Sequence, residues 1–358
     1  MKTISFKSIG LSFLLISFTI FIISCSGEGE NNKEDSRLSF FSQLLDAEDL
    51  SLTLETDYDQ LLLNKEGEED MYQNATITAH SRDIEYLRSK VQIRPRGVTR
   101  RSLCDFPPLM IKIQKDERKR LDVKKTDNIK LVSFCKDNPE FQDLVAKEFL
   151  IYKLYNVLTD TSYNVKWATL NVVDSLGKTH ISDQLAFLIE PTDNMAARLG
   201  CTYNEADVSP VKRIHKEQYK NFVVFQYMVG NTDWNLSRRH NIRMLDCNSE
   251  LGPKPVPYDF DYSGFVNAIY AKPHSMLPIT NVTDRLFQFR GSVEEDFSAT
   301  YSLFNAKKTS FYSTVQNFSH LNEDTKQTIV AYMDAFYENI SSNETMVAEM
   351  MKVRKKKS

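Results

Sequence analysis

The sequence predicts an α+β protein in which a sheet with one helix precedes a mostly helical half. Short apolar runs bounded by turn residues fill the first half of the chain, whereas apolar residues spaced three and four apart fill the second half. The 358 residues are 41% hydrophobic and 26% charged, with 11 Gly and 11 Pro. This composition is typical of a folded globular chain and disfavours disorder, collagen and solenoid repeats.

The charge balance and the missing motifs exclude several classes of function. The chain carries 45 Lys plus Arg and 48 Asp plus Glu, so its net charge of −3 gives no bulk attraction for nucleic acid. It contains no GxSxG, no HExxH and no CxxC. We therefore do not expect a nucleic-acid-binding protein, a serine hydrolase of that type, a zinc protease or a structural zinc site.

The N-terminus has the layout of a signal peptide. Two lysines precede an apolar run over residues 9–23, which is shorter than the roughly 20 residues of a spanning helix. The sequence Ile22-Ile23-Ser24-Cys25 resembles the bacterial lipobox, in which the cysteine is lipidated. The alternative is a signal anchor with an incidental cysteine. We predict a lipoprotein signal peptide over 1–24, a flexible tether over 25–37, and a lipid-anchored protein of the bacterial cell envelope, outside the cytoplasm.

Four more cysteines remain in the expected mature chain, in a compartment where disulfides persist. Four cysteines allow three pairings, and the sequence does not choose among them. Buried free thiols are the alternative to one or two disulfides. The residues are Cys104, Cys135, Cys201 and Cys247.

The elements of the first half predict a small antiparallel sheet with one long helix. The helix over 141–158 has its apolar residues three and four apart and follows Asn138 and Pro139, which favour a helix start. Short amphipathic helices are expected over 38–45 and 57–63. Strands are expected at SLTLET, NATITAH, KVQIRP, LMIKIQ, NIKLVSFC, VKWATLNVVD and QLAFLIEP.

The second half predicts a helix over 216–229, a loop rich in Asn, Arg and His, a short strand PVPYDFD, and helices over 293–347. The chain is thus divided into an N-lobe over 38–190, a C-lobe over 191–350 and a basic tail over 351–358. No repeat of fixed period is present.

The most informative stretch is YMVGNTDWNLSRRHNIRM, followed by PVPYDFD. It holds Asp233 on a loop, Asn241 several residues later and Asp259 on the next expected strand. Mg²⁺ takes oxygen ligands from carboxylates and amides and keeps substrate phosphate as a further ligand. Phosphoryl transfer uses such a set: one Asp orients the acceptor hydroxyl, while an Asn and a second Asp hold the metal.

GNTDWNLSRRHN with PVPYDFD resembles the catalytic and metal segments of the atypical kinases of the CotH and HipA type. The segments VQIRPRGVTRR, PPLMIKI, NIKLVSFCKDN and AKEF extend the resemblance upstream, so that it covers roughly residues 52–278. It implies a two-lobed protein-kinase-like fold, with an antiparallel sheet and one helix in the N-lobe and a mostly helical C-lobe. It also implies Mg²⁺ and ATP as cofactors.

The resemblance implies a role for each matching residue. Asp233 is the expected catalytic residue, and Asn241 and Asp259 are the expected metal ligands. Lys130 is expected to contact the nucleotide and to pair with Glu148. Lys112 is the alternative to Lys130, and Asn235 is the alternative to Asn241.

The sequence departs from a typical kinase over the phosphates, because it has no GxGxxG. Gly97 stands alone in RPRGVTRR, where Arg96, Arg100 and Arg101 are candidates for phosphate contacts. Plain surface charge is the alternative for Arg100 and Arg101. Two further residues are expected to act structurally through hydrogen bonds, Asp261 and His240.

The function expected from these residues is Mg²⁺-dependent nucleotide binding with phosphoryl transfer to a hydroxyl acceptor, by a lipoprotein. The acceptor is an unidentified protein or small molecule, and the bacterial membrane is a partner through lipidated Cys25. The first alternative is a catalytically inactive surface or periplasmic lipoprotein that binds a partner or ligand. The second is a structural envelope protein.

Replacing Cys25 with Ser tests the membrane anchor. We expect the variant protein to move to the soluble fraction or to stay unprocessed, because the several acyl chains of a lipoprotein anchor firmly whereas the protein alone has no other expected anchor. Cell fractionation and the mass of the mature chain measure this. Normal processing together with normal membrane retention would contradict the prediction.

Overall fold

The computed structural model describes residues 35–67, 70–203, 213–248 and 250–355, and the chain from Arg37 onward forms one compact unit. The expected signal peptide and Cys25 lie outside the described residues. Among the helices that are described, none has the length and apolar character needed to cross a membrane.

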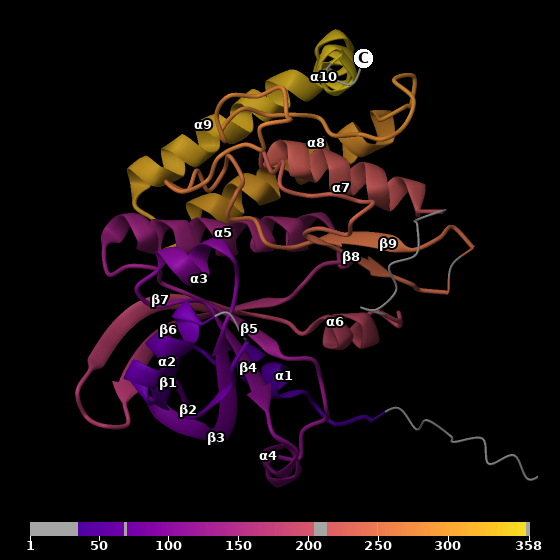
Figure 1. Cartoon of the computed structure of the whole chain (residues 1–358). Helices are drawn as coiled ribbons and strands as arrows, with labels where there is room; N and C mark the ends of the chain where they lie inside the picture. Colours follow the sequence, from indigo (N-terminus) through magenta and orange to yellow (C-terminus); the bar gives the residue numbers. More distant parts are fainter. Residues whose placement is uncertain (1–34, 68–69, 204–212, 249, 356–358) are drawn as a thin grey trace, which may run out of the picture. The chain divides into compact units, whose positions relative to one another are not determined.

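Seven strands close into a barrel with the order β1-β2-β3-β4-β5-β7-β6 (Figure 1). The strands are β1 (Leu50–Thr56), β2 (Gln73–Ser81), β3 (Ile84–Pro95), β4 (Leu109–Ile113), β5 (Ile129–Ser133), β6 (Val165–Asp174) and β7 (His180–Ile189).

Strand β1 closes the barrel because it pairs on both sides. It runs antiparallel to β2 and parallel to β6, so that Leu54 lies opposite both Ile77 and Val172. The predicted two-lobed kinase-like fold with an antiparallel N-lobe sheet is therefore wrong, because the strands close into a mixed barrel. Closure pairs the edge strands β1 and β6, whose backbone groups an open sheet leaves without partners.

The barrel has its own hydrophobic core, and β7 links it to a second one. Alternate residues of β1 point inward, among them Leu52 and Leu54. On β7, Leu188 faces the barrel core, whereas Phe187 belongs to the core that the helices form. Because β7 is buried on both faces, it holds the barrel against the helices.

Ten helices and a small hairpin complete the described part of the chain. The helix α10 extends into the region expected as a basic tail, and the expected strand at PVPYDFD ends at Pro257. The helices are α1 (Phe40–Leu45), α2 (Tyr58–Glu66), α3 (Thr99–Leu103), α4 (Lys115–Arg120), α5 (Pro139–Leu158), α6 (Thr192–Arg198), α7 (Lys216–Met228), α8 (Ser298–Gln316), α9 (Glu323–Ile340) and α10 (Asn343–Lys355); the hairpin strands are β8 (Ile242–Leu245) and β9 (Lys254–Pro257).

The helix α5 lies between the barrel and the later helices (Figure 1). The Asn138 side chain accepts a hydrogen bond from the Phe141 N–H at 3.1 Å, and Pro139 occupies the first turn, so both sequence signals of a helix start are used. Most of α5 is buried, including Glu148, which is 1% exposed. A carboxylate this deeply buried requires a partner.

All four cysteines of the described chain form disulfides, Cys104 with Cys135 and Cys201 with Cys247. The first bond joins the end of α3 to the residues that follow β5, and the second joins the residues after α6 to those after β8. Of the three pairings that the sequence leaves open, the structure adopts this one.

Candidate functional site

The predicted site residues come from five parts of the chain. Arg100 lies on α3, Lys130 on β5 and Glu148 on α5. The loop between α7 and β8 carries Asp233 and Asn241, and Asp259 follows β9. The fold thus collects residues from the barrel, from α5 and from the hairpin region.

The loop of Asp233 is held by its own residues. The Asn241 side-chain Nδ2 donates to the Asp233 backbone carbonyl at 2.7 Å and to its Oδ2 at 3.0 Å. His240 Nε2 lies 3.1 Å from the other carboxylate oxygen of Asp233, Oδ1. The Asp233 side chain nevertheless remains 40% exposed. Its carboxylate is therefore both fixed in direction and open to a ligand.

The alternative residue Asn235 has a different task. Its Oδ1 accepts a hydrogen bond from the Arg238 N–H at 3.0 Å, and its backbone pairs with that of His240 in both directions at 3.0 Å. Asn235 therefore shapes the turn, while Asn241 contacts Asp233. This geometry favours Asn241 over Asn235 as the amide of a metal site.

Asn241 also connects this loop to Asp259. Its backbone carbonyl accepts from the Tyr258 N–H at 3.2 Å, at the end of the β8–β9 ladder. Asp259 itself adopts a left-handed backbone conformation with φ of +64°, and its N–H donates to the Tyr152 hydroxyl at 3.0 Å. Left-handed φ is uncommon for a residue other than glycine, and such residues cluster at functional sites.

A buried arginine bridges two buried carboxylates beside Asp259. Arg100 Nη2 lies 2.7 Å from Glu148 Oε2, and Arg100 Nε lies 3.3 Å from Asp261 Oδ2. Arg100 Nε also donates to the Tyr270 hydroxyl at 2.7 Å, which in turn donates to Asp261 Oδ2 at 3.0 Å. We call Arg100, Glu148, Asp261 and Tyr270 the arginine cluster.

Burial raises the pKa of both carboxyls in the arginine cluster, Glu148 and Asp261. Desolvation raises the pKa of Glu148; Arg100 opposes this shift, whereas the charge of Asp259 adds to it. Desolvation likewise raises the pKa of Asp261 to about 7, against the attraction of Arg100 and with the repulsion of Asp259 and Glu148. Three carboxyls therefore act on one another here, and such perturbed groups are typical of functional sites.

Positive side chains surround the ring of Tyr258, next to Asp259. Lys130 Nζ and Arg243 Cζ each lie 4.4 Å from the ring centroid, and Arg243 Nη1 donates to the Tyr258 hydroxyl at 2.6 Å. Burial raises the pKa of that hydroxyl, and Arg243 and Arg96 lower it. A metal-bound phosphate requires both kinds of group, carboxylates to hold the metal and cations to contact the phosphate oxygens.

The ion pair of Glu148 involves a cation other than the expected one. The expected partner was Lys130, whereas the partner in the structure is Arg100. Lys112 Nζ, the alternative lysine, lies 5.4 Å from the ring centroid of Tyr72. Arg101 ties α3 to the region of α2, with Nη1 3.0 Å from Asp70 Oδ1. Arg100 is thus buried in the cluster and is no plain surface charge.

Sequence reasoning missed Arg243 and Tyr270 and assigned Asp261 only a general structural role. Arg243 is one of three arginines in the stretch RRHNIR, and no local pattern separates it from the others. Tyr270 follows Asp261 by nine residues through irregular chain. Their contacts depend on the tertiary fold, so no local residue pattern indicates them.

The donor set of this region suits a hard cation. Asn241 uses Nδ2 to bind Asp233, which leaves Oδ1 as its ligand atom, and Asp259 supplies a carboxylate. Within the described ranges, no group of three or more His, Cys, Asp and Glu side chains is arranged to hold a metal. Mg²⁺ is commonly held by one or two carboxylates together with substrate phosphate, so the oxygen donors of Asp259 and Asn241 are of the kind that this ion takes.

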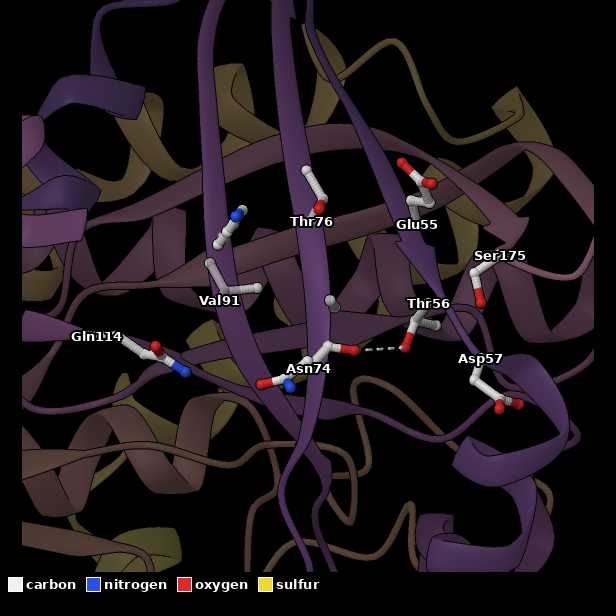
Figure 2. Close-up of a pocket in the computed structure, with 10 residues that line it drawn as sticks. Glu55, Thr56, Asp57, Asn74, Thr76, Val91, Gln114 and Ser175 are labelled. Carbon is white, nitrogen blue, oxygen red and sulfur yellow. Dashed lines mark hydrogen bonds between the residues drawn. The ribbon is translucent and has the colours of Figure 1, made fainter. Parts of the chain in front are cut away.

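A separate pocket of about 440 Å³ lies on the barrel and contains none of these residues (Figure 2). Glu55, Thr76 and Lys90 lie side by side on β1, β2 and β3 in this pocket. Its other lining residues are Thr56, Asp57, Asn74, Ala75, Val91, Gln114 and Ser175. Several of them already serve the fold; Asp57, for example, caps α2.

No protein-family model matches this chain, and no curated protein matches it.

The buried Asp261 predicts an unusual dependence of stability on pH. The folded protein keeps the Asp261 proton up to about pH 7, whereas the unfolded chain loses it near pH 4. At Asp261 the folded state binds more protons between these values, so the contribution of this residue to the free energy of unfolding should fall as pH rises from about 4 to about 7. Thermal unfolding from pH 4.5 to 8 should show a smaller fall in Asp261→Asn.

The matched control is Asp83→Asn, a change of the same chemistry on an exposed turn whose left-handed φ of +65° asparagine tolerates. It should keep the wild-type pH profile. Identical profiles for wild type and Asp261→Asn would contradict the assignment of a raised pKa to Asp261.

Proposed function

We propose that this protein binds a nucleotide together with Mg²⁺ and transfers a phosphoryl group to a hydroxyl acceptor. Asp233 orients the acceptor hydroxyl. Asn241 and Asp259 hold the metal against the phosphates. Lys130 and Arg96 provide positive charge for the phosphate oxygens.

The observation that carries this proposal is the position of Asn241 between the two aspartates. Its side chain fixes the Asp233 carboxylate through Nδ2, and its backbone pairs with Tyr258 next to Asp259. A group that orients a hydroxyl and a group that binds a metal must be held in a fixed relation for in-line transfer. Here the hydrogen bonds of Asn241 link Asp233 to the residue before Asp259 and so help to hold the two aspartates in a fixed relation.

The charge distribution supports the same proposal. Phosphoryl transfer gathers negative charge on the phosphate oxygens, and fixed cations and a metal offset it. Lys130 and Arg243 lie against the Tyr258 ring, one residue before Asp259. A phosphate near Asp259 would therefore meet both a metal ligand and positive side chains.

Each group has a defined part in the reaction. Bound Mg²⁺ supplies positive charge that stabilises the phosphate oxygens as the bond to the leaving group breaks. Asp233 accepts the proton of the acceptor hydroxyl while the oxygen of that hydroxyl forms a bond to the terminal phosphorus. The bond from that phosphorus to the bridging oxygen breaks, and the nucleoside diphosphate leaves with the electron pair. Asn241 keeps the Asp233 carboxylate in position.

Two substitutions separate binding from chemistry. Asp259→Asn should weaken Mg²⁺-dependent nucleotide binding, because the metal loses an anionic ligand. Asp233→Asn should bind nucleotide nearly as wild type but lower turnover by roughly two or more orders of magnitude, since a positioned base is lost. Thermal stabilisation by MgATP measures binding, and release of ADP measures turnover.

The exposed Asp83→Asn variant is the control and should keep both properties. Wild-type protein that gains no thermal stability from ATP with Mg²⁺ or Mn²⁺ would rule out the proposed function.

One observation favours a second candidate function, a catalytically inactive protein that binds a ligand in this region. Arg100 already contacts both Glu148 and Asp261, and all three side chains are buried. Arg100 therefore has protein partners in this cluster and is not held in reserve for a phosphate. Nucleotide binding without turnover in the wild type would favour this second function.

A further inference from the structure

A second pocket lies between α5, α9 and the chain that follows Asp261. We propose that a pocket centred on Lys147 binds a small oxyanion, either a carboxylate or a phosphate. This pocket is built by α5, by residues that follow Asp261 and by α9, and it shares no residue with the candidate functional site. Its lining residues are Lys147, Gly264, Phe265, Asn267, Thr283, Thr325, Thr328, Ile329 and Tyr332.

The size of the pocket limits the ligand. Its volume is about 220 Å³. Phosphate or a short carboxylate fits a space of this size. Phe265 and Ile329 form apolar walls that limit the competing water.

Lys147 provides the charge that selects an anion. Burial lowers the pKa of its ammonium, against the effect of Asp143 and Glu140, so this cation is only partly hydrated. Its Nζ donates to the Val266 carbonyl at 3.4 Å, which is long for such a bond. An ammonium has three N–H groups, and among the described residues this carbonyl is the acceptor that Nζ reaches. The remaining donors point to an oxyanion as ligand.

The surrounding groups set the strength of binding. The first turns of α9 line the pocket through Thr325 and Thr328, but the start of this helix adds no attraction for an anion, because Asn322 already accepts the Thr325 N–H and the first turn carries two acidic residues. Asp143 also opposes an anion, since its Oδ2 accepts a hydrogen bond from Thr325 Oγ1 at 3.1 Å and so lies close to the pocket. Removing the charge of Asp143 should therefore strengthen the anion's binding.

Isothermal titration with sodium phosphate and, separately, with sodium acetate tests the proposal without nucleotide or Mg²⁺. Wild-type protein should bind at least one of the two ions, and the preferred ion identifies the kind of oxyanion. Lys147→Met should lower the affinity roughly 10-fold or more, the cost of a lost hydrogen bond to a charged group. Lys147→Arg should retain binding, and Asp143→Asn should bind more tightly.

Lys130→Met controls for anions that bind at the candidate functional site, and thermal unfolding checks that every variant is folded. The proposal is overturned if folded Lys147→Met binds as wild type does, or if Lys130→Met alone removes binding. It is also overturned if wild type binds neither ion at concentrations up to about 10 mM. Because this titration omits nucleotide and metal, its failure leaves the proposed function untouched.

Discussion

The burial of Arg100 is the constraint on which the site depends. Its guanidinium contacts Glu148 of α5 and Asp261 of the segment after β9, so one side chain from α3 joins three separate parts of the chain. Removing one partner of a buried ion pair leaves an unpaired charge, which typically costs about 3–5 kcal/mol. The Cys104–Cys135 disulfide begins one residue after α3 and limits how far that helix can move. The positions of Glu148, Asp261 and their neighbour Asp259 follow from this arrangement.

The closed barrel makes a fixed base for these contacts. Strand β7 buries Leu188 inside the barrel and Phe187 against the helical core, where its ring lies 5.6 Å from that of Phe149 and 5.8 Å from that of Tyr152. Tyr152 in turn accepts the hydrogen bond from the Asp259 N–H. The packing of the barrel on α5 therefore helps to fix the backbone of Asp259, the candidate metal ligand.

Local elements were predictable from the sequence, whereas their assembly was not. The helix α5 was expected from its apolar spacing and from Asn138 and Pro139, and the strands from their turn-bounded apolar runs. The parallel pairing of β1 with β6 joins segments far apart in the chain, and no local pattern encodes it. Asp233 and Asn241, which the loop motif assigns to one site, are hydrogen-bonded to each other in the structure. The choice of Arg100 as the partner of Glu148 depends on where α3 packs, which residue spacing does not reveal.

A structure of the protein with Mg²⁺ and a nonhydrolysable ATP analogue would show whether these residues form one site. We expect a metal about 2.1 Å from Asn241 Oδ1 and from a carboxylate oxygen of Asp259, with the terminal phosphate between Asp233 and Lys130. A nucleotide bound away from these residues, or a metal held without Asp259, would contradict it.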